Sequence, residues 1–443
     1  MNNQFRYLSL RLALFVFVAV PLAAPFAAAQ TSGAMAAKTG QGTINDWPNN
    51  LPGDRHKVSP ADLPAPNHTE SATNFSKVVP RPPDAMLKAP AGFTVEQLAM
   101  GFEDPRVITT APNGDLFVAE NGGGKITILR LNGAGKEPTR ETFASDLTQP
   151  YGIAFYPLGS NPQYVYVGNT NSVVRFPYRN GDLKARGAAE KIADIPGGGK
   201  FGGGHSTRNL AFSRDGKKLY VAVGSKNNIS DAAEENERAN VLEMNPDGSG
   251  RRVYASGTRN PVGLIRHPST GQLWITVNER DRLGDDLVPD YVTHIVDNGF
   301  YGWPWYYIGQ NHDPRMGEKP EMKSKVLVPD VLFQSHSAPV SVFFYTGKQF
   351  PAQYRNGAFV SLHGSWNRAK RTGYKLVFVP APGGKATGEY VDFITGFVVD
   401  DANVWGRPQG IAQTQDGSLV FSDDASNSVW RVTYTGSQQR ASR

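Results

Sequence analysis

A two-strand pattern recurs six times along this chain and restricts its fold more than any other feature. Each copy has a proline or asparagine, a short apolar strand, a turn, and a second apolar strand that ends in small or polar residues. The copies begin at Asp104, Gln149, Thr207, Arg259, Ala338 and Arg407. Asn-Gly and Asp-Gly pairs tolerate the positive φ of tight hairpins, and they predict turns at Asn113-Gly114, Asp215-Gly216, Asn356-Gly357 and Asp416-Gly417.

The spacing of these copies predicts the architecture. A period of roughly 50 residues without a helical signal is typical of four-stranded blades around a central channel. The 47 glycines, 32 prolines and 11% aromatic residues agree, because they favour strands and tight turns over helices. We therefore predict an all-β fold, a six-bladed β-propeller over residues 89–436. A pair of β-sandwiches is the alternative, but it would not repeat one motif at blade spacing.

The two ends of the chain lie outside the repeats. Residues 1–29 combine a positive start, a short apolar core and an Ala-Ala-Ala cleavage site, which predicts a signal peptide rather than a membrane anchor. We thus expect a periplasmic or secreted protein with no membrane span after cleavage. Residues 30–88 are rich in Pro, Asn, Ser and Ala and predict an extended segment that wraps the main domain, or else a plain linker. Residues 437–443 form a polar tail.

The composition excludes several classes of function. The chain has no cysteine, which excludes disulfides, cysteine-bound zinc, iron–sulfur clusters and covalently attached c-type haem. Redox chemistry would therefore need a bound organic cofactor or a metal held by oxygen and nitrogen. The formal charge of +6 is modest for 443 residues and the basic residues are dispersed, so nucleic acid is not an expected partner.

Polar residues stand just before the first strand in four of the copies. They are His205 with Arg208 and Asn209, Arg259 with Asn260, His336, and Arg407. Because the innermost strands of a propeller begin at the channel mouth, these side chains are expected to converge on the axis. A histidine there can remove a proton near neutral pH, and the arginines can bind the carboxylates of a polyanionic ligand. The alternatives are a surface histidine and ordinary salt bridges.

A long insertion between the fourth and fifth copies adds two further candidates. Its acidic cluster, Glu279, Asp281, Asp285 and Asp286, suits calcium, or else is a solvated loop. The aromatic run at 301–307 predicts a wall for a flat cofactor or a sugar, or else packing at a blade edge. The sequence contains no G-x-S-x-G nucleophile elbow, P-loop, dinucleotide fingerprint or H-E-x-x-H motif.

Five stretches together resemble a known family. They are GGGHSTRNLAFSRDGKKLYVAVGS, YASGTRNPVGLIRHPSTGQLWITVNERDRLGDDLVPD, NGFYGWPWYY, GAFVSLHGSWNR and GRPQGIAQTQDGSLVFSDD, and they cover most of residues 92–434 in family order. The sequence resembles the soluble dehydrogenases that depend on pyrroloquinoline quinone (PQQ), the glucose/sorbosone dehydrogenase family. Within that family it is most similar to the L-sorbosone dehydrogenase-like branch.

The resemblance implies roles for named residues. It implies a six-bladed propeller that holds the quinone on its axis with Ca²⁺, and it makes His205 the general base that takes the substrate hydroxyl proton. Arg259 then lies by the quinone carbonyls, Asn260 contacts the cofactor, and Arg407 binds a quinone carboxylate. Arg208 is a further candidate for cofactor binding, as an axial cation rather than by the resemblance.

The resemblance also shows departures from the family pattern. The chain has Arg280-Asp281 where family members often have a Gly-Pro pair whose carbonyls bind the calcium ion. Asp285, Asp286 and Tyr301 are the remaining metal candidates, for the quinone-site ion or for a second, structural calcium. His363, Arg368 and Lys370 compete for the place of the family's cofactor-binding lysine.

We therefore predict an exported quinoprotein dehydrogenase that oxidises an aldose or sorbosone-type sugar and passes electrons to an external acceptor. One alternative is a non-catalytic propeller that binds carbohydrate or protein, which the altered Arg280-Asp281 pair favours. Another is a calcium-dependent lactonase, which also uses six blades but lacks support from the R-N-P motif at Arg259.

Overall fold

The structure, a computed structural model, describes Met1 and residues 36–40, 47–133, 135–198 and 203–436. The predicted signal peptide beyond Met1, the C-terminal tail at 437–443 and the first glycine before His205, Gly202, lie outside the described residues.

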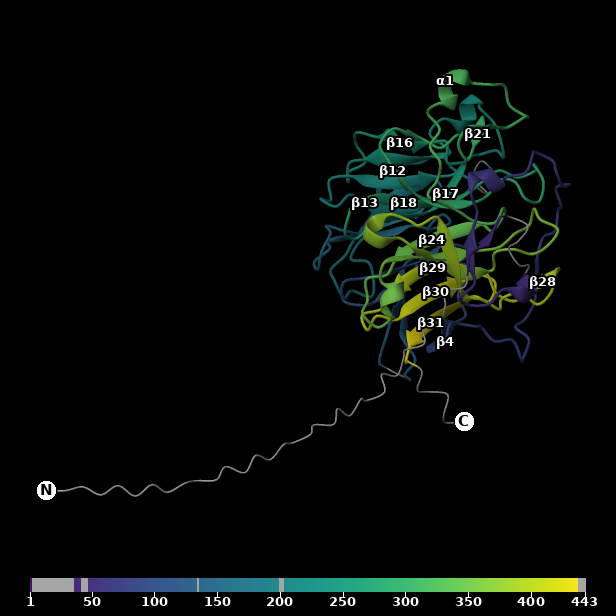
Figure 1. The fold of residues 1–443 in the computed structure, drawn as a ribbon. Helices are drawn as coiled ribbons and strands as arrows, with labels where there is room; N and C mark the ends of the chain where they lie inside the picture. The colour runs from purple at the N-terminus through teal and green to yellow at the C-terminus, as the bar shows by residue number, and fades with distance from the viewer. Residues whose placement is uncertain (2–35, 41–46, 134, 199–202, 437–443) are drawn as a thin grey trace. The chain divides into compact units, whose positions relative to one another are not determined.

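Six antiparallel four-stranded blades make up the domain, as predicted (Figure 1). Blade 1 has β5 (Pro105–Thr110), β6 (Leu116–Glu120), β7 (Lys125–Arg130) and β8 (Thr139–Ala144). Blade 2 has β9 (Ile153–Tyr156), β10 (Tyr164–Asn169), β11 (Ser172–Pro177) and β12 (Glu190–Asp194). Blade 3 has β13 (Leu210–Phe212), β14 (Leu219–Val223), β15 (Asn240–Met244) and β16 (Arg252–Ser256). Blade 4 has β17 (Asn260–Arg266), β18 (Leu273–Asn278), β19 (Tyr291–Ile295) and β23 (Val331–Leu332).

The last two blades complete the ring. Blade 5 has β24 (Pro339–Phe344), β25 (Gly357–Leu362), β26 (Lys375–Pro380) and β27 (Glu389–Ile394). Blade 6 has β29 (Pro408–Gln413), β30 (Leu419–Asp423) and β31 (Ser428–Tyr434) from one end of the domain, and β4 (Phe93–Met100) from the other. In Figure 1 the yellow β29, β30 and β31 lie beside the purple-blue β4. Pairing from Phe93↔Tyr434 to Met100↔Ser428 therefore closes the ring.

Neighbouring blades bury the middle strands on both faces. Every residue of β6, β14, β15, β25 and β30 is buried, whereas the outer strands β12 and β4 contain only half-buried and exposed residues. This burial explains why the second strand of each repeat reads as a continuous apolar run. Gly114, Gly216 and Gly417 have positive φ at their hairpins, as predicted. Gly357 does not; it begins β25, where an added Cβ would lie 2.3 Å from the Val379 carbonyl oxygen.

An apolar plug closes the axis. Val107, Tyr151, Val262 and Val340 come from four blades and pack together, and the Tyr151 hydroxyl donates to the Val340 carbonyl at 3.2 Å. Beneath the plug, all six inner strands line a cavity of about 390 Å³. The plug therefore interrupts the central channel, which is not an open pore in the described structure.

The segment before the propeller packs on blades 5 and 6. The strands β1 (Lys38–Thr39) and β2 (Arg55–Lys57) extend blade 5 beyond β27, and β3 (Lys77–Val78) pairs with β28 (Asn403–Val404). The buried Asp392 carboxylate anchors β2, because it lies 3.1 Å from His56 Nε2 and 2.7 Å from Lys375 Nζ. Short 3-10 turns lie at Trp47–Asn49, Pro60–Asp62, Ala233–Glu235, Ala352–Tyr354 and Pro382–Gly384.

The long insertion lies within blade 4, between β19 and β23, and forms a lobe on the rim that adds one strand to blade 3 through the pairing of its first strand with β16. It contains β20 (Gly299–Phe300), the hairpin of β21 (Tyr306–Tyr307) and β22 (Asn311–His312), and the helix α1 (Pro320–Lys323). Arg280 is fully buried and anchors this lobe, because it donates to the Pro304 and Tyr306 carbonyls at 2.8 and 2.7 Å. No helix among the described residues is both long and apolar enough to cross a membrane.

Candidate active site

One end of the propeller, which we call the upper face, carries two kinds of residue. Some come just before the innermost strand of a blade, and the others come just after the second strand of a blade. They meet because the first two strands of each blade are antiparallel. This topology brings together most of the predicted residues: His205 before β13, Arg259 and Asn260 at the start of β17, His336 before β24, His363 after β25, and Arg407 before β29.

His205 is positioned as a neutral base. Its Nδ1 lies 2.8 Å from the Ser225 carbonyl oxygen, so Nδ1 carries the proton and donates it. No described residue lies within hydrogen-bonding distance of its Nε2, which is left as an acceptor. Burial, together with the positive charge of Arg259, lowers the pKa of His205 to about 3. The imidazole is therefore uncharged at any physiological pH.

Gly224, directly after β14, lets His205 approach Asn260. A Cβ at this position would lie 2.3 Å from Asn260 Oδ1 and 2.6 Å from His205 Cβ. Glycine is thus required here for close packing, not for backbone freedom, since its φ is not positive.

We predict that Gly224→Ala displaces both polar side chains and lowers the turnover proposed below by about tenfold to 100-fold, because a misplacement of about 1 Å has effects of this order. The midpoint of thermal unfolding measures whether the propeller itself stays intact. Gly317→Ala is the matched control, since no atom lies within 4 Å of the added carbon there. Equal turnover by the two variants would contradict this reading of Gly224.

Arg259 is the centre of a buried network. Its guanidinium donates to the Glu279 carbonyl at 2.7 Å, to Asn228 Oδ1 at 3.0 Å and to Asp281 Oδ2 at 2.9 Å. Burial alone would raise the pKa of Asp281, but Arg259 and His336 outweigh it and the pKa is lowered. Asp281 therefore remains a carboxylate that is paired with Arg259 and lies near His336.

Asp424, which follows β30, organises the opposite side of the upper face. This buried carboxylate accepts from Arg407 Nε and His363 Nε2 at 2.9 Å each and from Gln409 Nε2 at 2.7 Å, and Arg106 Nη1 lies 3.2 Å away. Burial alone would raise its pKa, but the surrounding cations hold the pKa well below its usual range. Burial lowers the pKa of His363, while the nearby Asp424 carboxylate opposes this effect.

Buried polar atoms without a hydrogen-bond partner occur in several parts of the described structure, and six of them belong to residues at this same end. These six are Gln149 Oε1, Asn169 Oδ1, Thr207 Oγ1, Arg259 Nε, Asn260 Oδ1 and Gln409 Oε1. These atoms come from blades 2, 3, 4 and 6. Such atoms are costly unless a ligand or water satisfies them, so their convergence marks the upper face as a ligand site.

Two predicted cofactor ligands are not at the site surface. Arg208 is fully buried, and its guanidinium donates to the carbonyls of His205, Thr207 and Pro196 at 3.0, 2.6 and 2.5 Å. It therefore supports the histidine loop from behind. Lys370 is exposed and pairs with Asp401 at 3.2 Å.

The predicted metal ligands do not converge. The two Asp285 carboxylate oxygens accept backbone N–H groups of Ala72 and Ala369, and Asp286 pairs with Arg368 at 2.7 Å. Tyr301 is buried and donates to the His294 carbonyl at 2.9 Å. Among the described residues, no group of three His, Asp or Glu side chains is arranged to hold a metal ion.

The aromatic run at 301–307 contributes mainly to packing. Tyr301, Trp303, Tyr306 and Tyr307 are buried in the lobe, and Tyr301 stacks on Tyr291. The Trp303 indole donates to the Asn228 carbonyl at 3.0 Å and so supports the Arg259 network from outside.

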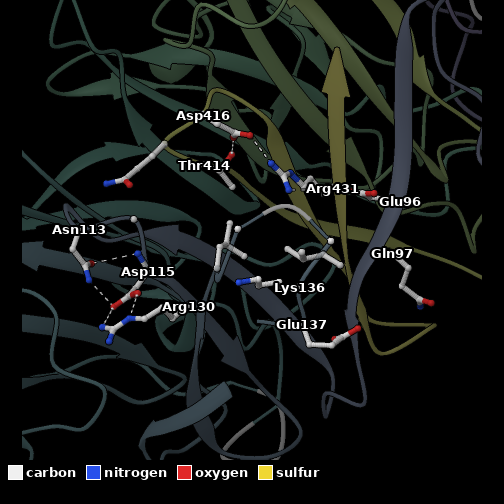
Figure 2. Close-up of a pocket in the computed structure, with 16 residues that line it drawn as sticks. Glu96, Gln97, Asn113, Asp115, Arg130, Lys136, Glu137, Thr414, Asp416 and Arg431 are labelled. Atoms are coloured by element: carbon white, nitrogen blue, oxygen red, sulfur yellow. Dashed lines mark hydrogen bonds and ion pairs between the residues drawn. The ribbon is translucent and has the colours of Figure 1, made fainter. Parts of the chain in front are cut away.

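A second pocket, of about 680 Å³, lies at the opposite end between blades 1 and 6 (Figure 2). Four of its charged side chains form two ion pairs, Arg130 with Asp115 and Arg431 with Asp416, as the dashed lines show. It contains none of the predicted site residues.

Several residues of the site were not singled out from the sequence: Arg106, Asn228, Arg315, Gln409 and Asp424. Asp424 had a usable signal, because it follows a second strand as His363 does and so belongs to the same end. Asn228 and Arg315 lie on irregular loops whose path the repeat pattern does not define.

The fold and site together define a six-bladed propeller with a cationic axial pocket and a neutral histidine. The family model described as glucose/sorbosone dehydrogenase matches residues 102–365, and a model described as TrAA12-like matches residues 319–435. The first match covers more than half of the chain. The chain therefore belongs to the glucose/sorbosone dehydrogenase family, as the sequence resemblance predicted.

Individual relatives agree with this assignment. An uncharacterized protein of Borreliella burgdorferi is 30% identical, over 79% of this chain and 91% of that protein. The PQQ-dependent pyranose dehydrogenase of Coprinopsis cinerea is 24% identical over 79% of this chain but 55% of its own length, so this chain spans about half of it.

Solved structures support the fold. The holo PQQ domain of the Coprinopsis enzyme has a TM-score of 0.66 at 22% identity, covering 81% of this chain and all of that one. A calcium structure of a Trichoderma reesei family AA12 enzyme has a TM-score of 0.68 at 18% identity, covering 82% of this chain and 99% of that one.

Proposed function

We propose that this chain is an exported PQQ-dependent dehydrogenase that oxidises a sugar of the aldose or sorbosone type. The observation that carries the proposal is the neutral His205, whose Nε2 faces no protein partner among the described residues and which stands at the same end of the propeller as three arginines. Membership of a family that includes PQQ-dependent sugar dehydrogenases supports it.

The donor set of the upper face fits PQQ, which carries three carboxylates. Arg106, Arg259 and Arg407 come from three blades, and guanidinium groups bind carboxylates through paired hydrogen bonds. The side chains of Arg106 and Arg407 are 24% and 29% exposed, so both reach the pocket while Asp424 holds them. The unpartnered Asn260 Oδ1 and Gln409 Oε1 offer further polar contacts. When bound, the quinone would supply the two-electron acceptor that a cysteine-free chain lacks.

The protein's own part in the reaction is to move a proton. His205 Nε2 accepts the substrate hydroxyl proton as the C–H hydride departs and the carbonyl forms. Asp281 lies close enough to raise the pKa of the imidazole and so stabilises the imidazolium that results. Arg208, donating to the His205 carbonyl, holds the loop in place.

The rim of the upper face carries an exposed aromatic stack that supports a sugar substrate. Phe75 is 68% exposed and stacks on Trp366 at 5.0 Å, and Arg282 lies over the same indole at 5.2 Å. Trp366 and Arg282 are both close in sequence to residues of the site: Trp366 comes three positions after His363, and Arg282 comes directly after Asp281. Sugars bind exposed aromatic faces through their apolar C–H surfaces.

We predict that Phe75→Ala raises KM for a disaccharide by about twofold to tenfold with little change in kcat, since one aromatic contact contributes on the order of 1 kcal/mol. Steady-state kinetics with a monosaccharide and a disaccharide measure this. Met86→Ala removes an equally exposed apolar side chain from the same segment and serves as control. An unchanged KM for both sugars would remove the stack from the substrate site.

Electron transfer and location complete the proposal. Because a chain without cysteine cannot attach a c-type haem covalently, we propose that the electrons leave to an external acceptor. We propose that the reaction takes place outside the cytoplasm, because residues 1–29 predict a signal peptide.

Reconstitution tests the function directly. The purified chain, loaded with PQQ, is expected to reduce an electron-accepting dye in the presence of at least one sugar from an aldose and ketose panel. Absence of turnover with every sugar, by wild type and His205→Ala alike, would contradict the proposal. Hydrolysis of a sugar lactone without quinone would instead favour a lactonase, and sugar binding without turnover a binding module.

A further inference from the structure

The turn that follows β18 presents main-chain oxygens at the upper face, and side-chain donors already occupy them. Arg315 Nη1 donates to the Asp281 carbonyl at 2.8 Å and lies 3.4 Å from the Arg282 carbonyl. Asn228 Nδ2 also donates to the Asp281 carbonyl, at 2.9 Å, and Arg259 occupies the Glu279 carbonyl. Adjacent carbonyls facing one point are what a hard cation such as Ca²⁺ binds, and here a guanidinium holds that place.

Arg315 is fixed in this position by a buried carboxylate. Its Nε and Nη2 donate to the two carboxylate oxygens of Asp313 at 2.9 and 2.7 Å, a bidentate pair. Asp313 is fully buried, and although burial raises its pKa, Arg315 and Arg280 outweigh burial and lower it. The guanidinium therefore cannot move aside without leaving a buried carboxylate half paired.

The carboxylates nearby offer no free ligand set either. Asp281 is taken by Arg259 at 2.9 Å, with His336 Nδ1 at 3.6 Å, and Asp286 is taken by Arg368. Asp285 is satisfied by backbone N–H groups. A divalent cation at this turn would have to displace a hydrogen-bond donor, charged or neutral, from the Asp281 and Glu279 carbonyls and from the Asp281 and Asp285 carboxylates. The residues present therefore do not fit the Ca²⁺ ion that the family resemblance implies.

We propose that the cofactor pocket of this chain works without a divalent cation, because the Arg315 guanidinium takes the place of the ion on the Asp281 and Arg282 carbonyls. Arg315 is thus a positioning residue for the turn that bears Asp281. The part of this proposal that concerns the cofactor rests on the proposed function; the part that concerns the metal does not.

Titration of the cofactor-free protein with the metal alone tests the second part. Terbium stands in for calcium, and Trp303, bonded to Asn228, can sensitise its emission. Wild type is expected to show no saturable binding that calcium displaces below about 1 mM, the weak end of natural calcium sites. Arg315→Ala removes the guanidinium from both carbonyls and leaves only the neutral Asn228 amide on the Asp281 carbonyl, so this variant is expected to bind at least tenfold more tightly, whereas the exposed control Lys325→Ala is not. Micromolar calcium binding by wild type that Asp281→Asn abolishes would overturn the proposal.

A chelator experiment tests the first part. Calorimetric affinity for PQQ is expected to agree within about twofold in EDTA and in millimolar calcium. A loss of more than tenfold in EDTA that calcium restores would overturn the proposal. If PQQ binds under neither condition, the proposed function fails, while the terbium titration of wild type still decides whether the turn holds a metal.

Discussion

Replacing His205 by alanine is expected to lower kcat for quinone-dependent sugar oxidation by about 10²- to 10⁴-fold, the range that a positioned general base contributes. The imidazole is the group whose Nε2 faces the pocket without a protein partner among the described residues, and Nδ1 is already committed to the Ser225 carbonyl. Steady-state dye reduction measures the loss, and calorimetry with PQQ is the control, because cofactor affinity should change by less than about threefold. A variant that keeps half of the wild-type kcat would remove His205 from the chemistry.

The pH dependence follows from the same residue. With its pKa lowered to about 3, His205 is deprotonated throughout the range from about pH 5 to 8, in which an ordinary histidine titrates. We therefore expect kcat/KM to show no histidine inflection there and to fall only as the pH drops toward 3. An inflection near the ordinary pKa of about 6.5 that persists in His336→Gln would contradict the assignment.

Asp424→Ala is expected to cost about 3–5 kcal/mol of unfolding free energy, because it removes a buried carboxylate that two half-buried guanidinium groups share. Arg106, Arg407, His363 and Gln409 all lose this partner at once. Chemical denaturation measures the change. Asp194→Ala removes an exposed carboxylate paired with Lys191 and should change stability by less than about 0.5 kcal/mol.

The sign of the pH effect gives a second check on Asp424. Its folded-state pKa lies well below the unfolded value of about 3.9, so its contribution is fully present above that pH and is lost as the pH falls below it. The stability difference between wild type and Asp424→Ala should be constant from about pH 5 to 7 and shrink below about pH 4. A difference that persists unchanged at pH 3 would show that the carboxylate charge is not responsible.

The sequence predicted the propeller because each blade repeats a local pattern of strand, turn and buried strand. It did not predict how the ring closes, since β4 pairs with β31 across most of the domain and shows no strong apolar alternation of its own. Likewise, Asn356-Gly357 has turn chemistry, yet Gly357 is needed where β25 packs closely on Val379.

Position along a blade predicted His205, Arg259, Asn260 and Arg407 at the upper face, because the start of an inner strand is fixed by topology. The direction of a long side chain is not fixed in this way. Arg208 stands two residues before the start of β13, yet its guanidinium turns into the blade and donates to three carbonyls.

Calorimetric titration of PQQ into the purified protein tests the central claim, that arginines from several blades bind an anionic quinone at the upper face. We predict one quinone per chain, with affinity at least about tenfold weaker in Arg407→Ala and unchanged in Arg355→Ala, a cation held by loop carbonyls near the turn between β24 and β25. Absence of binding by wild type, or binding that Arg407→Ala and Arg259→Ala leave unchanged, would contradict the claim.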